Sequence, residues 1–211
     1  MALSALSILK SKTRAAILKI FFNNTDGEYY LRQLEGLIGY SVGNIRREML
    51  KLEKDGLFIT RNIGKTKLYA VNKAYLLYRE IRDIVRKTIG IEGGLKDVLQ
   101  EYNDIRFAFI HGSYAEAREH SLSDIDVVII GEAKPQKVKA ALFEYQNNTG
   151  REINSIVYTG KEFLDKVYSK NHFVRTLVSS KKIFVKGNQN EFRRFIQIRK
   201  TQKIQNKYPR D

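Results

Sequence analysis

A pair of aspartates interrupts an otherwise apolar stretch of this 211-residue chain. The stretch DIDVVII, residues 124–130, predicts a buried strand, and the alternation of a strand puts Asp124 and Asp126 on one face. Two neighbouring carboxylates are costly in such a strand unless a cation neutralises them. The pair therefore predicts a sheet that carries a cation site, and short carboxylate ligands suit Mg²⁺ bound together with phosphate oxygens.

A glycine–serine step follows the preceding apolar strand, IRFAFI at residues 105–110. Gly112 lets the backbone approach a polyphosphate closely, and the amides and the Ser113 hydroxyl of such a turn suit phosphate binding. A phosphate-binding turn beside metal-binding carboxylates is the arrangement needed for nucleotidyl transfer. His111, just before the turn, is expected to pack or hydrogen-bond locally rather than to act in catalysis.

The remaining patterns predict an α+β chain with two parts. In the first, we expect three helices (12–22, 30–37 and 42–54), two strands (57–60 and 67–71) around a turn at 61–66, and a helix at 75–89 with Leu77, Ile81, Ile84 and Val85 on one face. In the second, we expect helices at 95–102, 114–119, 137–147, 161–170 and 173–179, and strands at 105–110, 124–130, 153–158 and 182–185.

Charge and composition narrow the classes of function. The net charge of +15 lies at the two ends, because residues 1–88 carry +9 and residues 181–211 carry +8, while the middle is slightly acidic. Basic ends favour a polyanionic partner. The absence of cysteine excludes disulfides, thiolate catalysis and cysteine-ligated metals. No apolar run is long enough for a membrane span, and no signal peptide is evident, so we expect a cytoplasmic protein without a membrane partner.

The stretch YLRQLEGLIGYSVGNIRREMLKLEKDGLF resembles prokaryotic winged-helix regulators over about residues 12–71. The resemblance implies a fold of three helices and a β-hairpin wing that binds double-stranded DNA. Ser41 would cap the third helix over a phosphate, and the hairpin would contact the DNA backbone. The implied DNA-binding residues are Ser41, Asn44, Arg46, Arg47 and Lys51 on the helix and Arg61, Lys65 and Lys67 on the wing. An ordinary solvated helix face, or a winged helix that binds protein, is the alternative.

The second part resembles the minimal branch of the polymerase β-type nucleotidyltransferases. Its motif is Gly-Ser, ten residues and Asp-x-Asp, and here Gly112-Ser113 is followed by ten residues and Asp124-Ile125-Asp126. The resemblance implies a small mixed sheet, an NTP substrate (ATP in the first place), and two Mg²⁺ ions. Gly112 and Ser113 would bind the β- and γ-phosphates, and Asp124 and Asp126 would hold the metals and act in catalysis.

Two departures from that family pattern bear on activity. A third carboxylate normally lies on the next strand, but the aligned residue is Asn154, which takes up no proton at neutral pH. Glu152 has the same strand parity and is our candidate for the third catalytic acid. The Ala-Arg-Gly that usually follows Gly-Ser-x is also missing, because Tyr114 is followed by Ala115-Glu116-Ala117, and Arg118 comes two places late.

The sequence thus predicts a winged-helix domain (1–73), a connecting helix (74–90), a nucleotidyltransferase-like domain (91–187) and a basic C-terminal helix or tail (188–211). The expected function is DNA binding with Mg²⁺-dependent NTP binding and nucleotidyl transfer to a hydroxyl of a protein, an RNA or a small molecule. The alternative is a transcriptional regulator whose inactive domain serves as a nucleotide sensor or structural platform. A third reading resembles antitoxins of this branch, which modify a partner toxin. Whether the chain is an enzyme, and whether the connecting helix pairs two copies in a homodimer, stay open.

Overall fold

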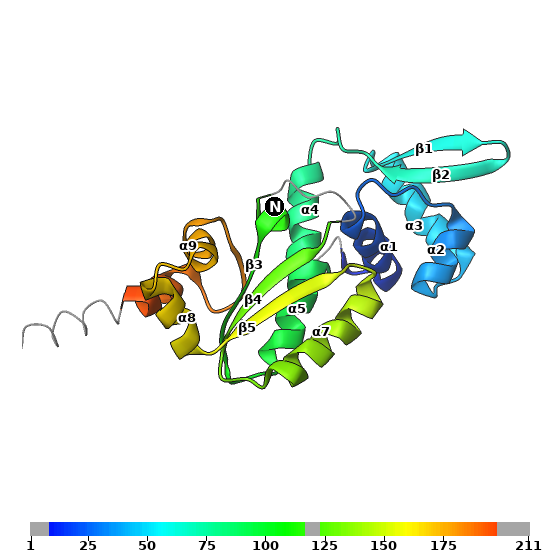
Figure 1. Ribbon diagram of the computed structural model, residues 1–211. Helices are drawn as coiled ribbons and strands as arrows, with labels where there is room; N and C mark the ends of the chain where they lie inside the picture. Colours follow the sequence, from blue (N-terminus) through cyan, green and yellow to red (C-terminus); the bar gives the residue numbers. More distant parts are fainter. Residues whose placement is uncertain (1–8, 117–122, 198–211) are drawn as a thin grey trace, which may run out of the picture. The chain divides into compact units, whose positions relative to one another are not determined.

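The computed structural model describes residues 9–116 and 123–197 (Figure 1). The chain divides into two compact units, with the boundary between Gly94 and Leu95. Both units combine helices with a small sheet, so the mixed α and β composition expected from the sequence is confirmed. Within the described residues, every helix is too short or too polar to cross a bilayer.

The first unit contains helices and one hairpin around a single apolar core. Its elements are α1 (Lys12–Asn23), α2 (Leu31–Ile38), α3 (Val42–Lys54), β1 (Phe58–Ile63), β2 (Thr66–Val71) and α4 (Tyr78–Thr88). The amphipathic spacing of α3 buries Ile45, Met49 and Leu52, as its sequence predicts. These side chains join Phe21 of α1, whose ring meets the Phe58 ring edge-on at 4.6 Å.

Helix α4 differs from the predicted helix at its start. It begins at Tyr78, three residues later than expected, because a turn centred on Asn72 occupies the intervening chain. The Asn72 side chain accepts a hydrogen bond from the Ala74 amide, and its carbonyl accepts one from the Tyr75 amide. Leu77 is therefore 48% exposed and not on the buried face.

The apolar face of α4 is used within its own unit. Ile81 and Val85 are buried in the core that α1 also lines, so this face is not left for a second copy of the chain. The buried Arg86 side chain donates to Glu92 at 3.1 Å, which links the end of α4 to the start of α5 (Ile91–Gln100).

The second unit is built on a four-stranded mixed sheet in the order β5-β4-β3-β6. Strands β3 (Ile105–His111) and β4 (Ile125–Gly131) are antiparallel, β4 and β5 (Ile153–Tyr158) are parallel, and β6 (Ile183–Lys186) is antiparallel to β3. The helices between them are α6 (Gly112–Ala115), α7 (Pro135–Thr149), α8 (Gly160–Tyr168) and α9 (His172–Ser179). The part of the predicted helix 114–119 beyond Glu116 lies outside the described residues.

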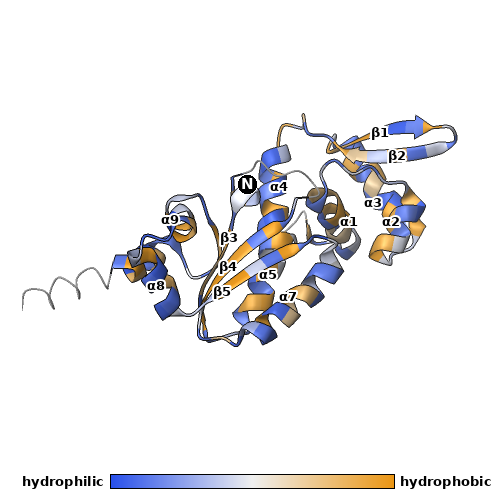
Figure 2. Ribbon diagram, viewed as in Figure 1, coloured by the Kyte–Doolittle hydropathy of each residue, from blue (hydrophilic) through white to orange (hydrophobic). Residues whose placement is uncertain are grey.

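Alternation along the strands gives the sheet two apolar faces, and Figure 2 shows the apolar character of β4. One face packs against α8, α9 and residues of the C-terminal segment, while α5 and α7 lie on the other side (Figure 1). The first face contains Phe107, Phe109, Val128, Ile130, Phe163, Val174, Leu177, Phe192 and Phe195.

The beginning of the basic C-terminal segment belongs to this core. Residues 189–197 are helical, and Phe192 and Phe195, three residues apart, are buried. The Phe192 ring lies 5.3 Å from that of Phe109. The remainder of the predicted tail, with Arg199, falls outside the residues that the structure describes.

Candidate functional site

The glycine–serine turn lies directly against one of the two aspartates. Gly112 follows β3 and adopts φ +72, a conformation that favours glycine. A Cβ placed on Gly112 would lie 2.9 Å from Oδ2 of Asp126. The absence of a side chain at Gly112 therefore makes room for the Asp126 carboxylate beside the Ser113 turn.

Three strands bring one row of side chains to the same face of the sheet. His111 of β3 is paired with Asp126 of β4, and Asp126 is paired with Asn154 of β5. Asp124 is exposed directly before β4. It lies two residues before Asp126, and so its side chain shares the face of Asp126. Because the same parity continues into Phe109 and Val128, this site face is the one that α8 and α9 cover further along the strands.

Asn154 lies at the position predicted for a third carboxylate. Its side-chain Nδ2 donates a hydrogen bond to Oδ2 of Asp124 at 3.1 Å. An amide in this place orients Asp124, but it adds no negative charge. Glu152 is exposed just before β5, and its carbonyl accepts from the amide of Ile125. The assignment of Glu152 as third acid stays a prediction.

The donor set fits a hard divalent cation held by two carboxylates. Mg²⁺ commonly takes one or two carboxylates and completes its octahedral shell with waters and substrate phosphates. The Gly112 turn lies directly against the Asp126 carboxylate. Across residues 9–116 and 123–197, no group of three or more His, Cys, Asp or Glu side chains is placed to hold a metal. Binding of two ions, as the family resemblance implies, stays a prediction.

His111 packs against a neighbouring side chain, as predicted from the sequence. Its ring meets the Phe173 ring edge-on, with 6.0 Å between centroids. Burial lowers the pKa of His111, and the nearby Asp126 carboxylate opposes that shift. Because burial has the larger effect, the pKa is lowered overall, which favours a neutral imidazole at pH 7.

Arg151 is a positioning candidate that the sequence pattern does not indicate. It is buried, and its Nη2 donates to the Ser123 carbonyl at 2.7 Å, which ties down the chain immediately before Asp124. An arginine after a helix-ending glycine such as Gly150 is usually solvated, so its place in the sequence carries no signal.

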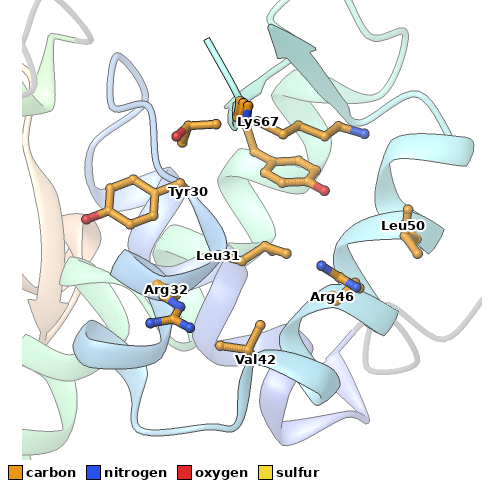
Figure 3. Close-up of a pocket in the computed structure, with 10 residues that line it drawn as sticks. Tyr30, Leu31, Arg32, Val42, Arg46, Leu50 and Lys67 are labelled. Carbon is orange, nitrogen blue, oxygen red and sulfur yellow. The ribbon is translucent and has the colours of Figure 1, made fainter. Parts of the chain in front are cut away.

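In the first unit, an open pocket of about 670 Å³ lies between α2, α3 and the hairpin (Figure 3). Three of the predicted DNA-binding residues line it, namely Arg46, Lys65 and Lys67. The other lining residues are Tyr30, Leu31, Arg32, Val42, Leu50, Thr66 and Tyr69. The structure thus brings one helix residue and two hairpin residues of the predicted set together.

The other predicted residues of α3 lie elsewhere on its exposed surface. Asn44, Arg47 and Lys51 are exposed at helical spacing but do not line the pocket. The ammonium group of Lys51 lies 3.5 Å from a carboxylate oxygen of Glu48.

One predicted position on the hairpin needs correction. The hairpin turn is the two-residue step Gly64-Lys65, with φ +57 at Gly64, because β1 and β2 pair as far as Ile63 and Thr66. Arg61 is therefore not in the turn but within β1, where it forms an ion pair with Glu28. Lys67 lies within β2 and donates to Glu53 at 2.8 Å.

Ser41 precedes α3 as expected, but its side chain accepts no capping hydrogen bond. The amide of Val42 is instead satisfied by Oε1 of Glu35, at 3.1 Å. The carboxylate of α2 thus satisfies the first amide of α3, and the Ser41 hydroxyl makes no capping bond.

Comparison with known proteins supports a class for the second unit. Residues 94–190 match the family model described as polymerase beta, nucleotidyltransferase. A toxin-antitoxin crystal structure with AMP-PNP is similar at 14% identity and TM-score 0.37, over 55% of this chain and 90% of that one. A mutant of the toxin-antitoxin MntA-HpeT is similar at 12% identity and TM-score 0.38, over 56% and 91%. No curated protein matches. The second unit contains a nucleotidyltransferase-like domain.

Proposed function

We propose that the protein is a DNA-binding protein whose nucleotidyltransferase-like domain binds a Mg²⁺–NTP complex, with ATP as its first candidate, and transfers the nucleotidyl group to a hydroxyl. The observation that carries the proposal is the contact between the Gly112 turn and Asp126, with Asp124 two residues away on the same face. The acceptor would be a protein or RNA hydroxyl, and we place the protein in the cytoplasm. We further propose four segments: a winged-helix domain (1–73), a connecting helix (74–90), the nucleotidyltransferase-like domain (91–187) and a basic C-terminal helix or tail (188–211).

Each residue of the site has a distinct part in this function. Asp124 and Asp126 would hold the cation, and the amides and hydroxyl of Gly112-Ser113 would hold the β- and γ-phosphates. When bound, Mg²⁺ neutralises phosphate charge and polarises the phosphorus for attack. Asn154 fixes one Asp124 oxygen, and Glu152 would accept the proton of the attacking hydroxyl.

Calorimetric titration of ATP, GTP, CTP and UTP, with and without Mg²⁺, tests nucleotide binding. Wild-type protein is expected to bind only with Mg²⁺, and Asp124→Asn is expected to weaken binding at least about tenfold, because one of two cation-binding charges is lost. Asp165→Asn, which removes a carboxylate on α8, is the matched control. Equal affinity with and without Mg²⁺, or an unchanged Asp124→Asn variant, would overturn the proposed site.

The first unit carries the DNA-binding part of the proposal. Three helices followed by a hairpin is the arrangement of winged-helix domains, and residues 1–88 carry a net charge of +9. Arg46 and Lys65 are exposed beside one pocket, so a duplex that approaches it meets a helix side chain and the hairpin turn together. Arg61 and Lys67 would first exchange their carboxylate partners for phosphates.

Duplex affinity measured at several salt concentrations tests this part. The double variant Arg46→Ala, Lys65→Ala is expected to bind the duplex more weakly. The plot of log K against log salt should also become less steep by about two, because each lost phosphate contact removes roughly 0.9 from the magnitude of its negative slope. Lys87→Ala, which removes an exposed charge on α4, should leave the slope unchanged. A slope equal to that of wild type in the double variant would contradict the proposed surface.

Asn154 favours a second candidate function. An amide hydrogen-bonded to Asp124 lies where a proton-accepting third carboxylate is expected, which suits a regulator that senses nucleotide without turnover. Nucleotide binding without transfer of label from α-³²P-ATP to any protein or RNA fraction supports this regulator. A partner toxin as the acceptor, as in the antitoxins of the branch that the sequence resembles, is the third candidate.

A further inference from the structure

An aromatic side chain lies exposed beside the row of site residues. Phe173 is the second residue of α9, 40% of its surface is exposed, and its ring contacts the His111 ring. His111 in turn is paired with Asp126 and directly precedes Gly112. A single side chain therefore separates the Phe173 ring from both the carboxylates and the phosphate turn.

Phe173 is held in a fixed place by the helix that carries it. The Asn171 side chain caps α9 by accepting from the Val174 amide at 3.1 Å. Val174 and Leu177 are buried in the core on the site face of the sheet. The ring is thus presented from a rigid element, which is the arrangement that lowers the entropic cost of binding a planar group.

Other exposed apolar side chains of this unit do not share these properties. Among its described residues, the large exposed apolar side chains are Phe143, Ile156 and Phe173. Phe143 belongs to α7, which lies on the other side of the sheet (Figure 1). Ile156 shares the parity of Asn154 but has no aromatic face. Only Phe173 among them combines an aromatic ring with a place next to the site.

We propose that the base of the bound nucleotide stacks on Phe173, an inference that rests on the proposed nucleotide binding. With the polyphosphate at Gly112-Ser113, the nucleoside projects from the turn over the face on which Phe173 lies. Stacking uses the π-face that every base has, so Phe173 accepts all four bases and favours the larger purines over pyrimidines. It does not distinguish adenine from guanine, which differ in their hydrogen-bonding edges and not in their faces.

Comparing a ligand with a base and one without it tests this inference. Mg²⁺–ATP and Mg²⁺–tripolyphosphate are titrated into wild type, Phe173→Ala, Phe173→Trp and the control Phe143→Ala. Phe173→Ala is expected to weaken ATP binding roughly ten- to a hundredfold, the equivalent of one base–aromatic stack, and to leave tripolyphosphate affinity unchanged. Phe173→Trp retains ATP affinity, and Phe143→Ala changes neither ligand. In wild type, ATP and GTP bind more tightly than CTP and UTP.

The contrary outcomes separate this inference from the proposed function. Equal losses for ATP and tripolyphosphate in Phe173→Ala would mean that the ring only supports His111 and the turn, and would overturn stacking. Unchanged ATP affinity would overturn it as well. If wild type binds neither ligand with Mg²⁺, the proposed nucleotide site itself fails. Thermal melting of each variant checks that the unit remains folded.

Discussion

Gly112→Ala is expected to weaken Mg²⁺–ATP binding by about 100-fold while the protein remains folded. The new Cβ would lie 2.9 Å from Oδ2 of Asp126, closer than a methyl group and a carboxylate oxygen normally approach. The residue also has φ +72, a region that costs a non-glycine residue about 1–2 kcal/mol. Relief of both strains moves the turn away from the carboxylate, so the phosphate-binding turn and the cation-binding carboxylate are no longer adjacent.

Gly150→Ala separates the contact from the backbone strain. Gly150 ends α7 with φ +65, and a Cβ there meets no heavy atom within 4 Å. The control should therefore lose a similar amount of thermal stability and retain full ATP affinity. If both variants lose affinity equally, the effect would come from general destabilisation, and the role given to the Gly112–Asp126 contact would be wrong.

If the second candidate function is right and the wild type lacks a general base, Asn154→Asp is expected to raise nucleotidyl transfer at least about 100-fold, because it adds a proton-accepting carboxylate in register with Asp126. General-base catalysis commonly contributes this factor or more, and an amide supplies none of it. Transfer is measured as label from α-³²P-ATP on acceptor and as released pyrophosphate. Asn154→Ala, which removes the donor to Asp124 without adding a charge, is the matched control.

The same substitution should make folding depend on the cation. Three carboxylates that face one another repel, and Asn154→Asp also removes the hydrogen bond to Asp124. We expect its melting temperature to fall in EDTA and to recover with Mg²⁺, more than for Asn154→Ala. If wild type already transfers label and Glu152→Gln abolishes it, the third acid would be Glu152, the candidate predicted from strand parity.

Local patterns were sufficient for most of the fold. The apolar strand around Asp126 and the spacing of Ile45 and Met49 depend on burial of one face, which periodicity records directly. The start of α4 could not be predicted, because the helical spacing of its apolar residues continues into Leu77 while side-chain bonds of Asn72 favour a turn. Local competition of this kind leaves no mark in the periodicity.

The residues that meet at the candidate site could be predicted from the sequence, but the contacts that surround them could not. The Gly-Ser and Asp-x-Asp spacing indicates which residues meet, because both lie at the ends of neighbouring strands. The bond from the Val42 amide to Glu35 and the place of Phe173 beside His111 depend on residues that pack together from separate elements. Sequence spacing cannot express such tertiary contacts.

The register of β5 has an evolutionary consequence. Because side chains alternate along a strand, a slip of one residue would place Ile153 or Ser155 opposite Asp126. The Asn154 side chain would then turn to the other face of the sheet. Glu152 enters the row only after a shift of two residues, roughly 6.6–7 Å along the strand, which would disrupt the whole parallel ladder. Asparagine and aspartate codons, by contrast, differ by one base. Descendants of this chain can therefore gain or lose the third acid by point mutation at residue 154 without changing their fold.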